Sequence, residues 1–379
     1  MGNRMTNQTL GEALQRDARS AARIEILRNP AATPAAARAA LLEDPGFGKV
    51  FTDHMVTVRW TSDRGWHDAQ LRARGPFALD PATAVLHYAQ EIFEGMKAYR
   101  LEGGELALFR PLENARRFIR SAERMAMPAL PEELFLEAVE TLVRVEADWV
   151  PTGEGSLYLR PFMFASEAFL GVRPAAEYIF CVIASPVGAY FKGGAKPVSV
   201  WATGDYSRAA PGGTGAAKCG GNYASSLLAQ AEAIRHGCDQ VVFLDAAEHR
   251  WVEELGGMNV FFVMGDQTLV TPPLGGTILP GITRDSIIAL APDLGLRVLE
   301  QPYDFDSWRA DAASGRLKEA FACGTAAVVA AIGEVRYPGG AFAIGSGGDG
   351  AVTGRLRDQL IGLQRGRLPD PRAWRHPIA

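Results

Sequence analysis

The sequence predicts an α+β protein of two domains, built on mixed and antiparallel sheets. Segments typical of strands and of helices follow one another without strict alternation, which disfavours a doubly wound parallel sheet. The chain has 379 residues, too many for one average core at about 150 residues per domain. A hydrophobic fraction of 47% is enough for packed domains.

Charge and cysteine content restrict the kind of partner. A net charge of -4 with mixed signs disfavours nucleic acid or an anionic membrane as the main partner and favours a small molecule. The cysteines lie far apart without a CxxC, which indicates reduced thiols and no zinc site or disulfide scaffold. No run reaches the about 18 apolar residues of a membrane span. We therefore expect a cytoplasmic protein without a structural metal.

The first part of the chain divides into an arm and a small domain. Residues 1–44 are expected to form a loosely packed arm with some helix, and residues 45–191 the small N-terminal domain. "KVFTDHMVTVRW" and "GWHDAQLRARG" predict a pair of strands, and "MKAYRLEGGELALFRP" predicts a second hairpin that turns at Gly103 and Gly104.

Two helices and two strands complete the small domain. "LENARRFIRSAERMAMP" and "PEELFLEAVETLVRVEADWVP" have apolar residues three or four apart and end at prolines, so they predict helices. "SLYLRPFMFAS" predicts a strand with Tyr158 and Arg160 on one face. After the buried-type strand "EYIFCVIASPVGAYF", the segment "KGGAKP" at 192–197 is expected to be the interdomain linker.

The large C-terminal domain is expected to cover residues 198–379. It begins with the strand "VSVWATGD". "NYASSLLAQAEAIRHG" predicts one helix capped by Asn222 and ended by Gly237. Further strands follow around turns at Gly256-Gly257 and Gly265-Asp266, and a helix is expected to begin near Ile282.

The stretch "APGGTGAAKCGGNY" places Lys218 among glycines. A phosphate-binding P-loop would need Gly-Lys-Ser/Thr, but Ala217 and Cys219 flank this lysine, and the dinucleotide fingerprint fails as well. Two interpretations remain open on the pattern alone: a flexible loop with a solvated lysine, or a lysine that forms a Schiff base with a carbonyl cofactor.

Several ordered stretches resemble those of the branched-chain aminotransferases, which are fold-type IV enzymes that use pyridoxal phosphate. They include "EIFEGMKAYR", "SLYLRP", "GGTGAAKCGGNY", "EELGGMN", "TPPLGGTILPGITR" and "ACGTAAV", and they run from about Phe47 to Val328. The resemblance covers roughly three quarters of the chain. It implies a pyridoxal 5'-phosphate enzyme with the two-domain fold of that family.

The resemblance implies a cofactor site. Lys218 takes the position of the Schiff-base lysine, and Tyr223 that of the partner of the phenolic oxygen. Glu254 would pair with the pyridine nitrogen, although the adjacent Glu253 leaves the choice less direct. The cofactor phosphate would be held by the remaining residues of this set: Arg110, the amides of Ile282 and Thr283, and Thr325.

It also implies a substrate pocket with aromatic and aliphatic walls. The positions that match are Phe47, Tyr88, Phe93, Tyr158, Val172 and Tyr190. Arg160 would lie beside Tyr88 and Tyr158 and orient a carboxylate, and the amides of Gly257 and Ala326 would bind the substrate carboxylate.

The implied reaction transfers the amino group of L-leucine, L-isoleucine or L-valine to 2-oxoglutarate, giving L-glutamate. Family members are homodimers, and Tyr88 would reach the active site of the other subunit. The alternative is another fold-type IV enzyme, a D-amino acid transaminase or an aminodeoxychorismate lyase. Both are typically shorter and lack "FTDHM" and "EGMKAYR".

Overall fold

The computed structural model describes residues 23–188 and 196–378. Contacts between residues divide this part of the chain into two units. The first holds residues 23–188 together with 373–378, and the second holds residues 196–372. The predicted α+β class with mixed sheets is confirmed.

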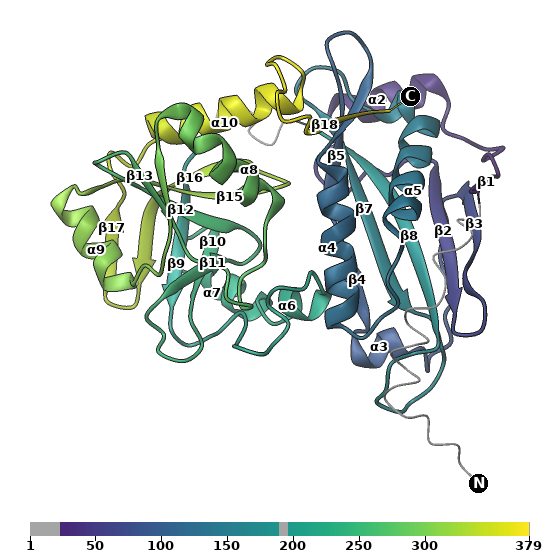
Figure 1. The fold of residues 1–379 in the computed structure, drawn as a ribbon, viewed down its shortest axis with the longest axis horizontal. Coiled ribbons are helices and arrows are strands. Elements are labelled where there is room, and N and C mark those ends of the chain that lie inside the picture. Colours follow the sequence, from purple (N-terminus) through teal and green to yellow (C-terminus); the bar gives the residue numbers. More distant parts are fainter. Residues whose placement is uncertain (1–22, 189–195, 379) are drawn as a thin grey trace. The chain divides into compact units, whose positions relative to one another are not determined.

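The first unit is a sheet covered by helices (Figure 1). Its strands lie in the order β1-β3-β2-β8-β7-β5-β6-β18, and β4 pairs with β7. The strands are β1 (Glu25–Ile26), β2 (His54–Thr61), β3 (Gly65–Ala73), β4 (Glu91–Phe93), β5 (Met96–Arg100), β6 (Leu106–Phe109), β7 (Ser156–Ala165), β8 (Glu177–Val187) and β18 (Arg375–Ile378). The helices are α2 (Ala35–Glu43), α3 (Ala84–Tyr88), α4 (Pro111–Arg124), α5 (Glu132–Val145) and the 3₁₀ turn η1 (Ala147–Trp149).

Helices α4 and α5 form where the apolar periodicity predicts them. The buried side of α5 carries residues three or four apart, among them Phe135 and Leu142. Phe118 of α4 contacts Phe135, and both rings contact Phe180 of β8. Each such fully buried side chain contributes about 1.5–3 kcal/mol. This aromatic cluster fixes the two helices against the sheet.

The second unit contains a closed ring of strands. Its order is β11-β10-β9-β16-β15-β12-β13-β14, and a further pairing of β11 with β12 joins the ends of the first six strands. The strands are β9 (Val198–Thr203), β10 (Gln240–Leu244), β11 (Val252–Leu255), β12 (Asn259–Met264), β13 (Thr268–Thr271), β14 (Arg297–Glu300), β15 (Leu317–Gly324), β16 (Val328–Tyr337) and β17 (Gly340–Ala343). The helices are α6 (Gly220–Ala224), α7 (Leu227–Arg235), α8 (Ile282–Leu290), η2 (Ala291–Leu294), α9 (Phe305–Ser314) and α10 (Ala351–Gln364).

Two sequence predictions about the second unit are wrong. The single helix expected over 222–237 is divided into α6 and α7. Asn222 lies inside α6 instead of capping it, because its side chain bonds the preceding loop. The second domain does not extend to the end of the chain, since β18 pairs antiparallel with β6 of the first unit. Strand pairing, which composition does not reveal, places those last residues.

No helix in the part of the chain that the structure describes is long and apolar enough to cross a membrane.

Candidate active site

Lys218 and Tyr223 lie together at the start of α6. Lys218 Nζ donates a hydrogen bond to the Tyr223 hydroxyl, at a distance of 2.8 Å. Cys219 is the N-cap residue of α6, so the helix begins directly after the lysine and places Tyr223 one turn further along. The structure therefore brings together the two residues that the sequence analysis assigned to the reactive end of the cofactor.

The loop before Lys218 is fixed by glycine geometry and by Asn222. Gly212 has φ of +78°, in the region that favours glycine. Gly215 has no positive φ, but a Cβ there would collide with the Thr277 carbonyl. The Asn222 side-chain amide donates hydrogen bonds to the carbonyls of Thr214 and Ala217, each at a distance of 2.9 Å. One glycine thus allows a turn, the other allows close backbone approach, and the lysine is presented by an ordered loop.

Glu254 is a buried carboxylate on β11 with several hydrogen-bond donors around it. It is 2% exposed, and its Oε1 accepts from the Leu279 amide at 2.9 Å. Arg208 Nη1 lies 2.8 Å from the same oxygen, and Asn259 Nδ2 is 3.3 Å from Oε2. Burial raises the pKa of Glu254 to about 7, against the opposing effects of the Arg208 charge and the Leu279 amide.

Glu253, the neighbouring carboxylate, has a different environment. Successive residues of a strand point to opposite faces, so the two side chains do not share a site. Glu253 Oε1 accepts a hydrogen bond from the Thr277 hydroxyl, and burial raises its pKa. The positive charge of Lys218 acts on the pKa of Glu254. Of the two carboxylates, Glu254 is thus the one whose pKa the charge of Lys218 affects.

Arg208 is a site residue that the predicted set does not include. It is 5% exposed and bonds the Thr277 carbonyl at 2.8 Å as well as Glu254. It thereby joins the loop before Lys218 to the strand of Glu254. Its only sequence signal is its position ten residues before Lys218, and an arginine in a polar loop is ordinarily solvated.

The first turn of α8 contains Ile282 and Thr283, as predicted. First-turn amides have no acceptor within their own helix, and the positive end of the helix dipole lies there. A Cβ at Gly281, the N-cap residue, would collide with the side chain of Asn259. Because Asn259 also bonds Glu254, the start of α8 is fixed close to the buried carboxylate.

Thr325 and Ala326 lie in the turn between β15 and β16. A Cβ at Gly324, just before them, would come within 3.6 Å of the Gly257 carbonyl oxygen. A Cβ at Gly257 would in turn lie 3.8 Å from the Tyr223 ring. The predicted carboxylate-binding segments around Gly257 and Ala326 therefore adjoin each other and the tyrosine.

Four of the predicted substrate residues form a cluster in the first unit. Phe47 meets Tyr158 edge to face at 5.2 Å, and Arg160 lies over the ring of Phe93 at 4.8 Å. Arg160 Nη2 donates to the Tyr158 hydroxyl at 3.1 Å. A Cβ at Gly95 would collide with that hydroxyl, so the tyrosine packs directly against backbone. Arg160 Nε is buried and has no hydrogen-bond partner among the described residues.

Other predicted substrate residues lie elsewhere. The sequence places Arg160 beside Tyr88 as well as Tyr158. In the structure the Tyr88 hydroxyl donates to the Leu170 carbonyl, because Tyr88 ends α3 next to the loop after β7. Val172 follows in that loop and is 88% exposed. Tyr190 lies outside the described residues.

Arg110 belongs to the first unit and has a strained backbone. Its φ is +50°, unusual for a residue with a side chain, and it precedes α4. Its amide donates to the Trp374 carbonyl at 2.8 Å, and its guanidinium lies 4.7 Å from the Trp374 ring centre. The C-terminal strand segment thus fixes this arginine, and its role toward a phosphate stays a prediction.

Comparisons with known proteins place this geometry in a family. The sequence model described as "Amino-transferase class IV" matches residues 91–335. A probable branched-chain-amino-acid aminotransferase of Streptomyces coelicolor is 58% identical, covering 90% of this chain and 95% of that protein. A branched-chain-amino-acid aminotransferase of Mycolicibacterium smegmatis is 56% identical, covering 91% and 95%.

Solved structures agree with the family match. The branched-chain amino acid aminotransferase of Escherichia coli has a TM-score of 0.69 at 30% identity, covering 86% of this chain and 99% of its own. A branched-chain amino acid aminotransferase from Thermobaculum terrenum in its PLP-form has a TM-score of 0.69 at 26% identity, covering 85% and 98%. These relatives do not favour the alternative fold-type IV enzymes. The chain belongs to the class IV aminotransferases.

Proposed function

We propose that the protein is a pyridoxal 5'-phosphate-dependent branched-chain-amino-acid aminotransferase. It would transfer the amino group of L-leucine, L-isoleucine or L-valine to 2-oxoglutarate. The observation that carries the proposal is the pair of Lys218 Nζ and Tyr223 Oη, 2.8 Å apart, in the same unit as the buried carboxylate of Glu254. Relatives that share more than half of the residues bear this name.

The residues of the second unit fit the cofactor chemically. A carboxyl with a pKa raised to about 7 by burial is matched to a protonated ring nitrogen, which would stabilise its charged form. The amides of Ile282 and Thr283 at the start of α8 suit a phosphate, together with Thr325. Arg110 is retained as a phosphate ligand from the sequence resemblance, since a guanidinium binds phosphate oxygens in pairs.

Each residue then has a separate task. When bound, pyridoxal phosphate supplies an electron sink for the bonds at the substrate Cα. Lys218 would hold the cofactor through Nζ and, as a free amine, take the proton from the substrate Cα. Tyr223 would hold Lys218 Nζ and the phenolic oxygen by hydrogen bonds. Glu254, oriented by Arg208 and Asn259, would keep the ring nitrogen protonated.

The substrate side chain would be bound by the cluster of Phe47, Phe93, Tyr158 and Arg160. Its aromatic walls suit branched aliphatic chains, which differ by a single methylene worth only about 1–3 kcal/mol. The buried Nε of Arg160, unpartnered among the described residues, suits the second carboxylate of 2-oxoglutarate. The amides of Gly257 and Ala326 are assigned to the carboxylate shared by all substrates, and Tyr190 is retained as a pocket residue from sequence.

A homodimer is part of the proposal. Exposed apolar side chains gather around Tyr88, whose hydroxyl bonds the Leu170 carbonyl. Leu86, Leu170 and Val172 are 59%, 68% and 88% exposed. Several exposed apolar side chains near one another are typical of an interaction surface, whereas a single one is not. A second copy of the chain would cover them, with Tyr88 and Val172 reaching its substrate pocket. A cytoplasmic location is proposed because all four cysteines are free and buried.

A spectroscopic titration of the purified protein tests the assignment. The visible band of the bound cofactor should fall when L-leucine, L-isoleucine or L-valine is added, and should return with 2-oxoglutarate. D-alanine should leave the band unchanged. In Lys218→Ala the band of the lysine-linked cofactor should be absent. A band that responds to none of the three branched-chain L-amino acids would refute the proposed substrate class.

A further inference from the structure

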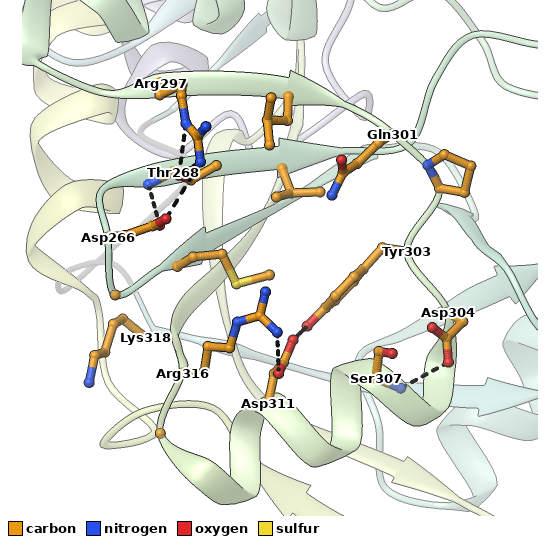
Figure 2. A pocket seen from close by; sticks show the side chains of 16 residues that line it. Asp266, Thr268, Arg297, Gln301, Tyr303, Asp304, Ser307, Asp311, Arg316 and Lys318 are labelled. Atoms are coloured by element: carbon orange, nitrogen blue, oxygen red, sulfur yellow. Dashed lines mark hydrogen bonds and ion pairs between the residues drawn. The ribbon is translucent and has the colours of Figure 1, made fainter.

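A cavity of about 690 Å³ opens in the second unit, between the β13–β14 edge of the sheet and α9 (Figure 2). None of the sixteen residues that line it belongs to the candidate active site. Side chains of the core, among them Met264, Val270 and Leu299, close one side of it, and Met264 and Val270 are only 7% and 2% exposed there. A volume of this size holds a small organic molecule.

A chain of hydrogen bonds places the guanidinium of Arg316, a side chain that is 70% exposed, at the opening of the cavity. The Tyr303 hydroxyl donates to Asp311 Oδ2 over 2.8 Å, and Arg316 Nη1 lies 3.3 Å from Asp311 Oδ1. Asp311 is only 8% exposed, so the acid is a fixed part of the cavity. Figure 2 shows the Arg316 guanidinium, the Tyr303 ring and the Gln301 amide pointing toward the middle of the cavity.

The acids around the cavity already accept hydrogen bonds. Asp266 accepts from the Thr268 amide and pairs with Arg297, and Asp304 caps α9 through the Ser307 amide at 2.9 Å. Asp311 is satisfied by Tyr303 and Arg316. Each of these acids is therefore engaged by groups of the protein itself.

The donors, in contrast, have capacity left. Within residues 23–188 and 196–378, Arg316 makes only its bond to Asp311, and the Gln301 side-chain amide and the Lys318 ammonium make no hydrogen bond. Arg316 and Gln301 point into the same space, and Lys318 lies at its edge (Figure 2). Donors that the protein itself does not engage, next to the side chains of Met264, Val270 and Tyr303, match a ligand with a carboxylate at one end and an apolar body at the other.

We propose that this cavity binds a small organic monocarboxylate with an apolar or aromatic body, at a site separate from the active site. The carboxylate is bound by Arg316 and Gln301, and the body lies against Met264, Val270 and the Tyr303 ring.

The probe is 4-bromobenzoate, whose bromine scatters anomalously. Crystals of the full-length, cofactor-loaded protein soaked in it should show bromine in the cavity, with the carboxylate toward Arg316. In solution, calorimetry should detect binding that Arg316→Gln weakens about tenfold, because a charge-assisted bond is lost. Gln301→Glu, which keeps the arginine and adds a negative charge, should weaken binding at least as much.

Arg309→Gln is the matched control, because Arg309 is a surface arginine of α9 outside the cavity, paired with Asp306 over 3.1 Å. It should leave binding unchanged, and all variants should keep the wild-type Tm and cofactor spectrum. Bromine found only at the active site would overturn the proposal. A second result would also overturn it: bromine in the cavity of the crystal, together with solution binding that neither Arg316→Gln nor Gln301→Glu weakens. This would mean binding at crystal concentration only.

Discussion

The Glu254→Gln substitution should remove a defined pH dependence from the stability of the cofactor-free protein. Burial raises the pKa of Glu254 from 4.5 to about 7 in the folded state. Between these values the folded protein keeps a proton that the unfolded chain has released, so stability falls as pH rises. At about 1.4 kcal/mol for each pH unit, the loss amounts to about 3 kcal/mol by pH 8. Below pH 4.5 both states are protonated and the effect is absent.

Urea unfolding of the cofactor-free protein, followed by circular dichroism at several pH values from 5 to 8, measures this directly. Glutamine is neutral throughout, so the unfolding free energy of Glu254→Gln should increase relative to that of the wild type as pH rises. Any constant cost from the unpaired Arg208 does not alter this slope. Glu248→Gln, at a carboxylate whose side chain is 59% exposed, is the control substitution. A flat difference for Glu254→Gln would mean that Arg208 keeps the carboxylate ionised, and would refute the reasoning.

Four further substitutions, one of them a control, test other parts of the structure. Tyr223→Phe removes the hydroxyl 2.8 Å from Lys218 Nζ and should lower kcat/KM about 10- to 100-fold in a steady-state transaminase assay, whereas unchanged kinetics would exclude the hydrogen bond from the reaction. Gly215→Ala should lower Tm by about 3–10 °C because the new Cβ collides with the Thr277 carbonyl. Gly221→Ala meets nothing within 4 Å and should leave Tm unchanged; equal effects of the two would contradict the close-approach argument. Val172→Asp should shift the protein from dimer to monomer in light scattering, and a dimer that persists would place the interface elsewhere.

Local patterns in the sequence determined much of the first unit and the order of the elements. The hairpin that turns at Gly103 and Gly104 and the helices α4 and α5 follow from apolar periodicity and from turn residues, which act over a few positions. The start of α8 at Ile282 was likewise predicted. The ordered stretches from about Phe47 to Val328 also indicated the family, because many residues at fixed spacings match it together.

Tertiary structure decided what depends on residues far apart in the chain. Asn222 bonds the loop before Lys218 and so divides one predicted helix into two, and β18 joins the sheet of the first unit. Arg208 becomes a site residue only because folding brings it within 2.8 Å of Glu254. The role of Gly215 likewise depends on Thr277, about sixty residues later in the chain, whose carbonyl lies against it. Periodicity and propensity report each residue's own neighbourhood, whereas burial, pairing and the raised pKa of Glu254 arise from contacts between distant segments.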